Sequence, residues 1–141
     1  MMAKNAEVIY WDASAILSVI FKDKHSRTAT SFAEQQAVHF ISSLSFAEVS
    51  AVISRLAQAK VLSDVLIEAG RDVLERGPWR KLNMAPAWHL LMEMSKRHIL
   101  KGADLWHLAA AKQLSVNFPE LLLLTFDDQL TKAAKREGLI P

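Results

Sequence analysis

Short, unbroken apolar runs recur along the chain and predict buried β-strands. The first is Val8–Trp11, which is β-branched and aromatic, and similar runs follow at residues 38–41 and 121–124. Residues 79–84 are less regular, and we expect a short extended segment there. Because strands that are buried on both faces read as continuous apolar stretches, these runs favour a mostly parallel sheet with helices on both sides.

Between these runs, apolar residues recur three or four positions apart, which predicts amphipathic helices. Val49, Ile53 and Leu56 show this spacing. We expect Pro86 to occupy the first turn of its helix and Gly138 to end the last helix. The predicted helices span residues 12–21, 28–36, 45–59, 64–76, 86–97, 102–114 and 127–137.

Short strands that alternate with helices predict a three-layer α/β/α domain with a short, mostly parallel central sheet. The 141 residues, of which 51% are hydrophobic, suit one domain over residues 1–141 with a sizeable core. In such sheets, ligands bind outside the carboxyl ends of the strands. The residues that directly follow the strands are therefore the first candidates for a functional site.

Composition excludes several classes of protein. The chain has no cysteine, so it can form neither a disulfide framework nor a thiolate metal site. No apolar run approaches the roughly 18 residues of a membrane helix, and Asp12 interrupts the apolar stretch that a signal peptide would need. We therefore expect a soluble, cytoplasmic protein that has no membrane partner.

The net charge of +2 is too small to indicate nucleic-acid binding by itself. Basic residues nevertheless form two clusters, one after the first helix and one before Asp104. We expect each of these side chains singly to lie on a solvated surface, whereas together they could hold a phosphate backbone around an acidic centre. The clusters are Lys22, Lys24, His25 and Arg27, and Lys96, Arg97, His98 and Lys101.

Four acidic residues stand near the starts of predicted helices. Asp12 and Asp127 follow strands, Glu48 lies in the first turn after the second strand, and Asp104 opens the helix before the Leu-rich strand. Carboxylates that converge at one sheet edge repel each other unless a cation binds. Oxygen ligands suit Mg²⁺, with Mn²⁺ as the alternative, and the absence of Cys and of a His-Glu-x-x-His pattern argues against zinc.

Each acid also has a purely structural interpretation as a helix cap. Ser45 and Glu48 have the spacing of a capping box, and so do Thr125 and Asp128. Two of the four acids could be N-caps, namely Asp12 and Asp104. Capping is the better explanation for any one acid alone. It does not explain why the acids gather without matching lysines or arginines beside them.

Other catalytic chemistries fit the sequence poorly. Ser14 is not part of a Gly-x-Ser-x-Gly elbow, and it occupies the place of the second aspartate in the Asp-x-Asp of haloacid-dehalogenase-like phosphatases. Asp12 lacks the adjacent acid of a phospho-acceptor domain, and Gly-rich phosphate loops are absent. The five histidines form no triad or metal spacing. We expect His107 to be a packing or surface residue, with a hydrogen bond near the acids as the alternative.

Four short motifs around the acids, in this order, resemble those of the PIN-domain family. An Asp-small-Ser motif follows the first strand, a Glu lies early in a helix, an Asp opens an Ala-rich helix, and the last strand ends in Thr-x-Asp. The segments are Asp12-Ala13-Ser14, Ser45-Phe46-Ala47-Glu48, Asp104-Leu105-Trp106-His107-Leu108-Ala109-Ala110-Ala111 and Thr125-Phe126-Asp127. The resemblance covers essentially the whole chain, and this short form is most similar to the VapC-type toxins of toxin–antitoxin pairs.

The resemblance implies a PIN-like fold and an Mg²⁺-dependent endoribonuclease that hydrolyses RNA phosphodiesters and leaves 5′-phosphate and 3′-hydroxyl ends. It makes all four acids catalytic and metal-binding residues, with Asp12 and Asp104 as principal ligands, Glu48 and Asp127 in support, and two hydroxyls orienting them, Ser14 and Thr125. It also implies a small cognate antitoxin and a homodimer. The alternative is a non-catalytic PIN-like module that binds RNA or protein.

Two features depart from the family pattern. Trp106 and His107 are bulkier than the residues we expect after the third aspartate, and residues 62–94 match no motif. We expect this variable region to shape substrate choice or partner binding. Several large apolar residues could contribute to a surface, although we expect each of them in the core: Phe46, Trp79, Trp88, Met92 and Met94.

Overall fold

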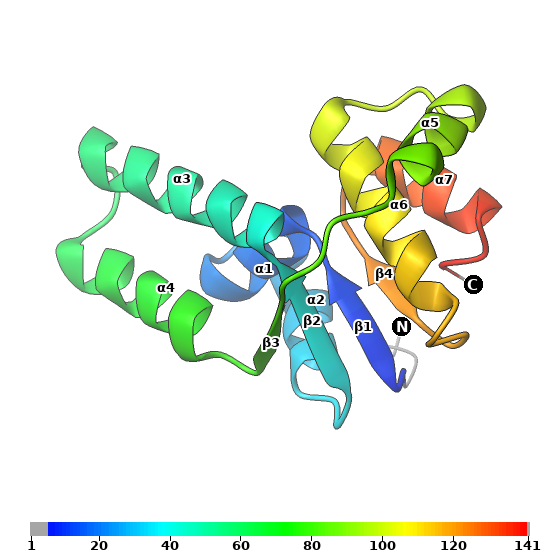
Figure 1. Cartoon of the computed structure of the whole chain (residues 1–141). Helices are drawn as coiled ribbons and strands as arrows, with labels where there is room; N and C mark the ends of the chain where they lie inside the picture. The colour runs from blue at the N-terminus through cyan, green and yellow to red at the C-terminus, as the bar shows by residue number, and fades with distance from the viewer. Residues whose placement is uncertain (1–5, 141) are drawn as a thin grey trace.

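The computed structural model describes residues 6–140, in which four short strands form one all-parallel sheet (Figure 1). The strand order is β3-β2-β1-β4. The strands are β1 (Val8–Trp11), β2 (Val38–Ser42), β3 (Trp79–Leu82) and β4 (Leu122–Leu124). Each apolar run that predicted a strand forms one, and the less regular segment forms the edge strand β3.

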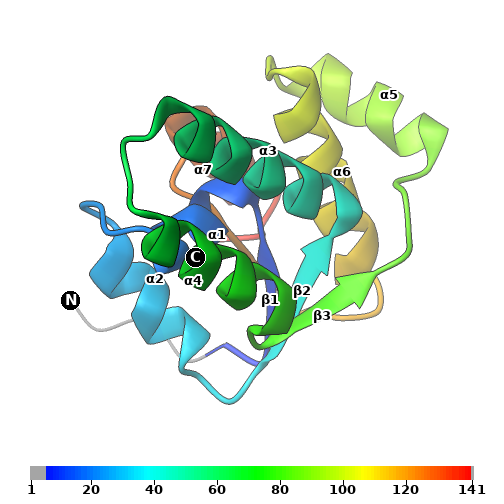
Figure 2. The same cartoon turned by 90° about the vertical axis from the view of Figure 1, so that its left-hand side faces the viewer.

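Helices cover both faces of the sheet, as Figures 1 and 2 show, which confirms the α/β class. Alternate residues of β1 pack against the two helical layers. Ile9 and Trp11 pack with α1 to α4, whereas Val8 and Tyr10 pack with α5 to α7. The helices are α1 (Ala13–Ile20), α2 (Ser26–Ala33), α3 (Ser43–Ala59), α4 (Asp64–Arg76), α5 (Trp88–Arg97), α6 (Gly102–Ser115) and α7 (Asp128–Arg136).

The order of the strands creates a switch point between β1 and β4. The chain passes from β1 outward to β2 and β3, and then returns to the other side of β1 to add β4. Trp11 is in register with Leu124 on one side and with Ile41 on the other. The residues that follow these strands therefore meet at one edge, in the place where open α/β sheets bind ligands.

Three predicted helix starts are wrong by two residues. Helix α2 begins at Ser26 and not at residue 28. Helix α3 begins at Ser43, two residues earlier than expected, since the Ser42 hydroxyl accepts a hydrogen bond from the Ser45 N–H at 3.0 Å and caps the helix. Helix α5 begins at Trp88, so Pro86 lies before the cap. The intervening N–H of Ala87 donates instead to Gln113 on α6, at 2.8 Å.

Two of the five large apolar residues that were expected in the core are exposed. Trp79 and Met94 are buried as expected, and Phe46 is half-buried. Trp88 and Met92 are 90% and 60% exposed, because they lie one turn apart on α5 and away from the face that places Met94 in the core. Within residues 6–140, none of the helices is both long and apolar enough to cross a membrane.

A buried ion-pair cluster ties the segment before α6 to the end of α7. The Glu137 carboxylate lies 2.6 Å from His98 Nε2, and Arg97 and Lys112 contact it at 3.2 and 3.4 Å. Burial would raise the pKa of Glu137, but the hydrogen bond with His98 and the charge of Arg97 hold it below its usual value. His98 is buried, so the expectation of a solvated basic cluster is wrong for this residue.

Candidate active site

The buried carboxylate of Asp12 lies at the switch point between β1 and β4. It caps α1, because Oδ1 accepts from the Ala15 N–H at 2.9 Å, and this confirms the predicted N-cap. The Ser14 hydroxyl donates to the same oxygen at 2.7 Å, and the Thr125 hydroxyl donates to Oδ2. Burial raises the pKa of Asp12, and these three hydrogen bonds limit the rise.

The two hydroxyls that hold Asp12 also hold the chain that follows β4. The Ser14 Oγ accepts from the Phe126 N–H at 3.0 Å, and the Thr125 Oγ1 accepts from the Asp127 N–H at 3.1 Å. A carboxylate offers about four acceptor positions, and hydrogen bonds occupy three of those on Asp12. One position on Oδ2 therefore remains for a cation.

Asp127 caps α7, since its Oδ1 accepts from the Leu130 N–H at 2.8 Å. The predicted capping box of Thr125 and Asp128 is therefore wrong. The Thr125 hydroxyl accepts instead from the Asp127 N–H, one residue before the helix begins, while it donates to Asp12. Capping leaves Asp127 Oδ2 without a hydrogen-bond partner among residues 6–140, and this residue lines a cavity.

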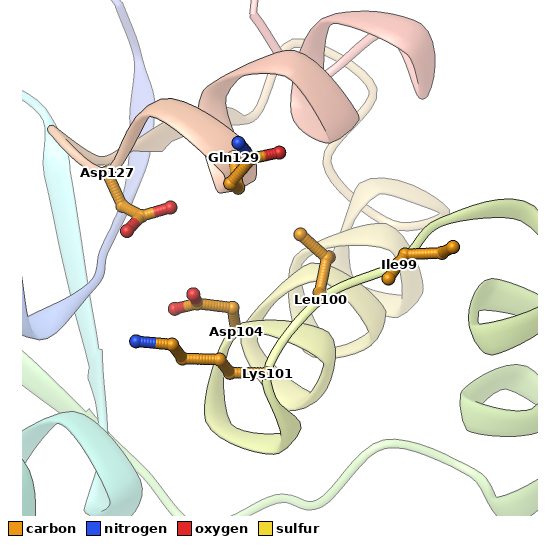
Figure 3. Close-up of a pocket in the computed structure, with 6 residues that line it drawn as sticks. All are labelled: Ile99, Leu100, Lys101, Asp104, Asp127 and Gln129. Atoms are coloured by element: carbon orange, nitrogen blue, oxygen red, sulfur yellow. The ribbon is translucent and has the colours of Figure 1, made fainter.

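Asp104 lies across that cavity from Asp127, and Figure 3 shows the two carboxylates turned toward each other. It is the third residue of α6, whose N-cap is Lys101, so the prediction that Asp104 is an N-cap is wrong. Burial and the charges of Asp127 and Asp12 raise the pKa of Asp104. The cavity has a volume of about 400 Å³ and is lined by Ile99, Leu100, Lys101, Asp104, Asp127 and Gln129.

Glu48 joins the site from α3 through a buried hydrogen-bond chain. Its Oε1 lies 2.7 Å from His107 Nε2, and the His107 Nδ1 lies 2.7 Å from the Tyr10 hydroxyl. The capping role expected for Glu48 is therefore wrong. His107 is buried, and the alternative expected for it, a hydrogen bond near the acids, is confirmed. Ser42 supplies the α3 cap, which leaves the Glu48 carboxylate available to reach across to α6.

The groups that this hydrogen-bond chain joins indicate its donors and acceptors. A carboxylate oxygen accepts, so the tautomer with the proton on Nε2 lets His107 donate to Glu48 Oε1. The same tautomer leaves Nδ1 to accept from the Tyr10 hydroxyl. Burial raises the pKa of Tyr10, which keeps the phenol protonated in this role. The chain thus orients one oxygen of Glu48 and leaves the other without a partner among the described residues.

The four acids have one basic partner among residues 6–140, the His107 imidazole beside Glu48. None of the ion pairs in residues 6–140 joins them to a lysine or arginine, although Lys101 lines the cavity beside Asp104 (Figure 3). Over the same range, no three His, Asp or Glu side chains form a ready-made metal shell. Magnesium and manganese fit such a site, because they are bound through one or two carboxylates and complete their shell with water and phosphate.

Comparison with known families agrees with this geometry. The family model described as PIN domain matches residues 9–136, which includes all four acids. The chain belongs to the PIN-domain family. PIN domains are typically metal-dependent nucleases, and a cavity lined by Asp104 and Asp127 is consistent with that chemistry. A search of curated proteins found no match to the chain.

The PIN motifs identified from sequence supply Asp12, Asp104 and Asp127 to one site, and Glu48 contributes the weakest of the acidic charges that act on Asp104. Sequence reasoning missed the part played by Tyr10 and gave the hydrogen bond of His107 only as an alternative. Two local signals pointed to them. Tyr10 lies two residues before Asp12 in a strand, and His107 lies one helical turn after Asp104.

Proposed function

We propose that this PIN domain is a divalent-metal-dependent endoribonuclease. The observation that carries the proposal is the cavity between Asp104 and Asp127, next to the buried Asp12. These carboxylates come from separate elements, and the charges of Asp127 and Asp12 raise the pKa of Asp104. Among residues 6–140, none of the three forms an ion pair with a lysine or arginine. A bound divalent ion would remove this repulsion, lower the pKa of the attacking water and stabilise charge on the phosphate.

In this proposal, Asp12 and Asp104 are the principal ligands of the ion, and Asp127 supports its waters. Ser14 and Thr125 hold Asp12 in one orientation through their hydroxyl groups. Such outer hydrogen bonds fix the direction of a ligand and strengthen binding.

Glu48 acts as the base in the proposed reaction. It accepts a proton from water, the water oxygen attacks phosphorus, and the bond from phosphorus to the 3′ oxygen breaks. His107 holds the carboxylate in place, because its Nε2 donates to Glu48 Oε1. The products carry a 5′-phosphate and a 3′-hydroxyl, and the proton that Glu48 received returns to solvent or to the leaving oxygen.

We further propose that the chain is the toxin of a VapBC-type pair. The support is the resemblance of its four motifs to those of VapC-type toxins, together with the absence of any arginine or lysine paired with the acids among residues 6–140. An arginine from a small antitoxin would pair well with these carboxylates. We also propose a homodimer in the cytoplasm, to which the exposed Trp88 and Met92 offer an apolar surface.

The deciding experiment is cleavage of a total RNA pool by the purified protein with Mg²⁺, Mn²⁺ or EDTA. Asp104→Asn should lower cleavage by at least about 100-fold, because it removes a charge that holds the ion. Asp128→Asn is the matched control, since Asp128 is an exposed acid one residue beyond the site. It should cleave at the wild-type rate, and all the proteins should unfold at similar temperatures.

Metal-dependent products that are lost with EDTA and with Asp104→Asn would support the nuclease. Equal inactivity of wild type and variant with both ions would reject it, provided that mass spectrometry finds no co-purified protein. A module that binds RNA or protein without cleaving it would then be the better account. Arrested growth on expression of the wild type, but not of Asp104→Asn, would support the toxin role.

A further inference from the structure

We propose that the stacked rings of His25 and Phe126 form a platform on which an unpaired base of the substrate stacks beside the cleavage site. The two rings are parallel, with centroids 4.3 Å apart and an angle of 3° between their planes. Both residues are only half-buried, so the pair is not enclosed in the core. This inference rests on the proposed RNA cleavage and adds which part of an RNA the site accepts.

The platform is fixed to the acidic site through the chain itself. Phe126 stands between Thr125, which donates to Asp12, and Asp127, which lines the cavity. Its own N–H donates to the Ser14 hydroxyl at 3.0 Å, and that hydroxyl also donates to Asp12. A base on this stack would therefore bring its neighbouring phosphate close to the carboxylates.

The loop that presents His25 is held in place before any ligand arrives. The Asp23 carboxylate accepts from the Ser18 hydroxyl at 2.8 Å and from the His25 N–H at 2.8 Å. The Ser26 hydroxyl in turn accepts from the Asp23 N–H at 2.8 Å. A preorganised ring loses little entropy when a base binds, so such a loop favours recognition.

The charges around the loop match a phosphate backbone. Lys22, Lys24 and Arg27 are exposed, and none of the three forms an ion pair within residues 6–140. Asp23 is the one acid in residues 22–27, and internal hydrogen bonds occupy its carboxylate. Aromatic rings flanked by cations are the means by which proteins bind single-stranded nucleic acid. Paired bases are not available for such stacking, so the platform favours loops and single strands.

The test uses a short single-stranded RNA that carries 2-aminopurine, whose fluorescence falls when the base stacks. Binding is measured with Ca²⁺ in place of Mg²⁺, and KM and kcat are measured with Mg²⁺ on the same RNA. We compare wild type with His25→Ala and His25→Trp. The matched control is His89→Ala, since His89 is an exposed histidine on α5, on the opposite face of the sheet.

Loss of the stack should raise the Kd and KM of His25→Ala by about 5- to 150-fold and abolish the quenching, while kcat changes little. His25→Trp should restore both quenching and binding, whereas a residue that only packs the loop would not be replaced by the larger ring. His89→Ala should behave as wild type. Double-stranded RNA of the same sequence should bind less tightly and should not depend on His25.

Unchanged quenching and KM in His25→Ala would overturn the platform. So would a weakened His25→Ala that His25→Trp fails to restore. If wild type cleaves RNA with Mg²⁺ while His25→Ala keeps its KM, this inference alone fails. If wild type neither binds nor cleaves RNA, the proposed function fails as well.

Discussion

Replacing His107 by leucine tests whether the hydrogen bonds that join Tyr10, His107 and Glu48 support the acidic site. His107 is 1% exposed and makes two hydrogen bonds of 2.7 Å. The substitution removes the hydrogen bond between His107 and the fully buried Tyr10 hydroxyl, which keeps Ser42 and Ser45 as partners, and such a loss costs about 0.5–1.5 kcal/mol. The Glu48 side chain is 33% exposed and regains water, so the loss of its hydrogen bond with His107 adds little. We expect a fall of about 0.5–1.5 kcal/mol in the free energy of unfolding.

Activity should fall further than stability suggests, because an unrestrained Glu48 no longer faces the substrate in one orientation. The loss of such a supporting hydrogen bond costs about 10–100-fold in activity or metal affinity. His107→Gln should retain more activity than His107→Leu. Its amide can donate to Glu48 and accept from Tyr10, which reproduces both contacts.

A double-mutant cycle separates this chain from ordinary packing. In Tyr10→Phe combined with His107→Leu, no polar group is left unpaired in the layer between β1 and α6. The double variant should therefore be more stable than the sum of the single losses predicts, by about 0.5–1 kcal/mol. Urea unfolding measures this coupling, and kcat/KM at saturating Mg²⁺ measures the effect on activity. Additive stability losses, or wild-type cleavage by a folded His107→Leu, would refute the reasoning.

Three further predictions concern stability and metal use. Glu137→Gln should lower the free energy of unfolding by about 1.5–3 kcal/mol at neutral pH. The pKa of Glu137 is lower in the folded protein than in the unfolded chain, where it is about 4.3. The difference in unfolding free energy between wild type and Glu137→Gln should therefore persist above about pH 4.3 and vanish as the pH falls through the folded pKa. Urea unfolding at a series of pH values measures it. Thr125→Val removes the hydrogen bond to Asp12 Oδ2 that limits the burial-induced rise in the pKa of Asp12. The acidic limb of the pH–rate profile should therefore move to higher pH, and the Mg²⁺ concentration needed for activity should rise about 10-fold. An unchanged profile would count against this role of Thr125. Gly70→Ala places a Cβ 2.8 Å from a methyl of Ile20, and calorimetry should show a lower Tm, equivalent to about 1–2 kcal/mol.

Local patterns in the sequence were enough to predict the strands and the positions of the acids. Val8–Trp11 is apolar on both faces because helices cover both sides of β1, and Asp12 follows at the point where α1 must be capped. The family resemblance then made these acids one site. Most of this information lies within a few residues of each element, which is why a single sequence carries it.

The errors came from contacts between distant residues. Glu48 and His107 are 59 residues apart, and Tyr10 and His107 are 97 apart, so no spacing rule links them. The same holds for the hydrogen bond from Thr125 to Asp12, which are 113 residues apart. The exposure of Trp88 likewise depends on which face of α5 packs against α6. The apolar periodicity of this ten-residue helix was not enough to predict that face.

The position of β4 beside β1 has a consequence for synthesis of the protein. The ribosome adds Asp12, Glu48 and Asp104 to the growing chain before it adds Thr125 and Asp127. Until β4 pairs with β1 and residues 125–127 follow it, Asp12 lacks the donor to its Oδ2, and the cavity lacks one wall. If the site cleaves RNA as proposed, the nascent chain would be inactive toward its own message until residues 122–127 have been made and have folded.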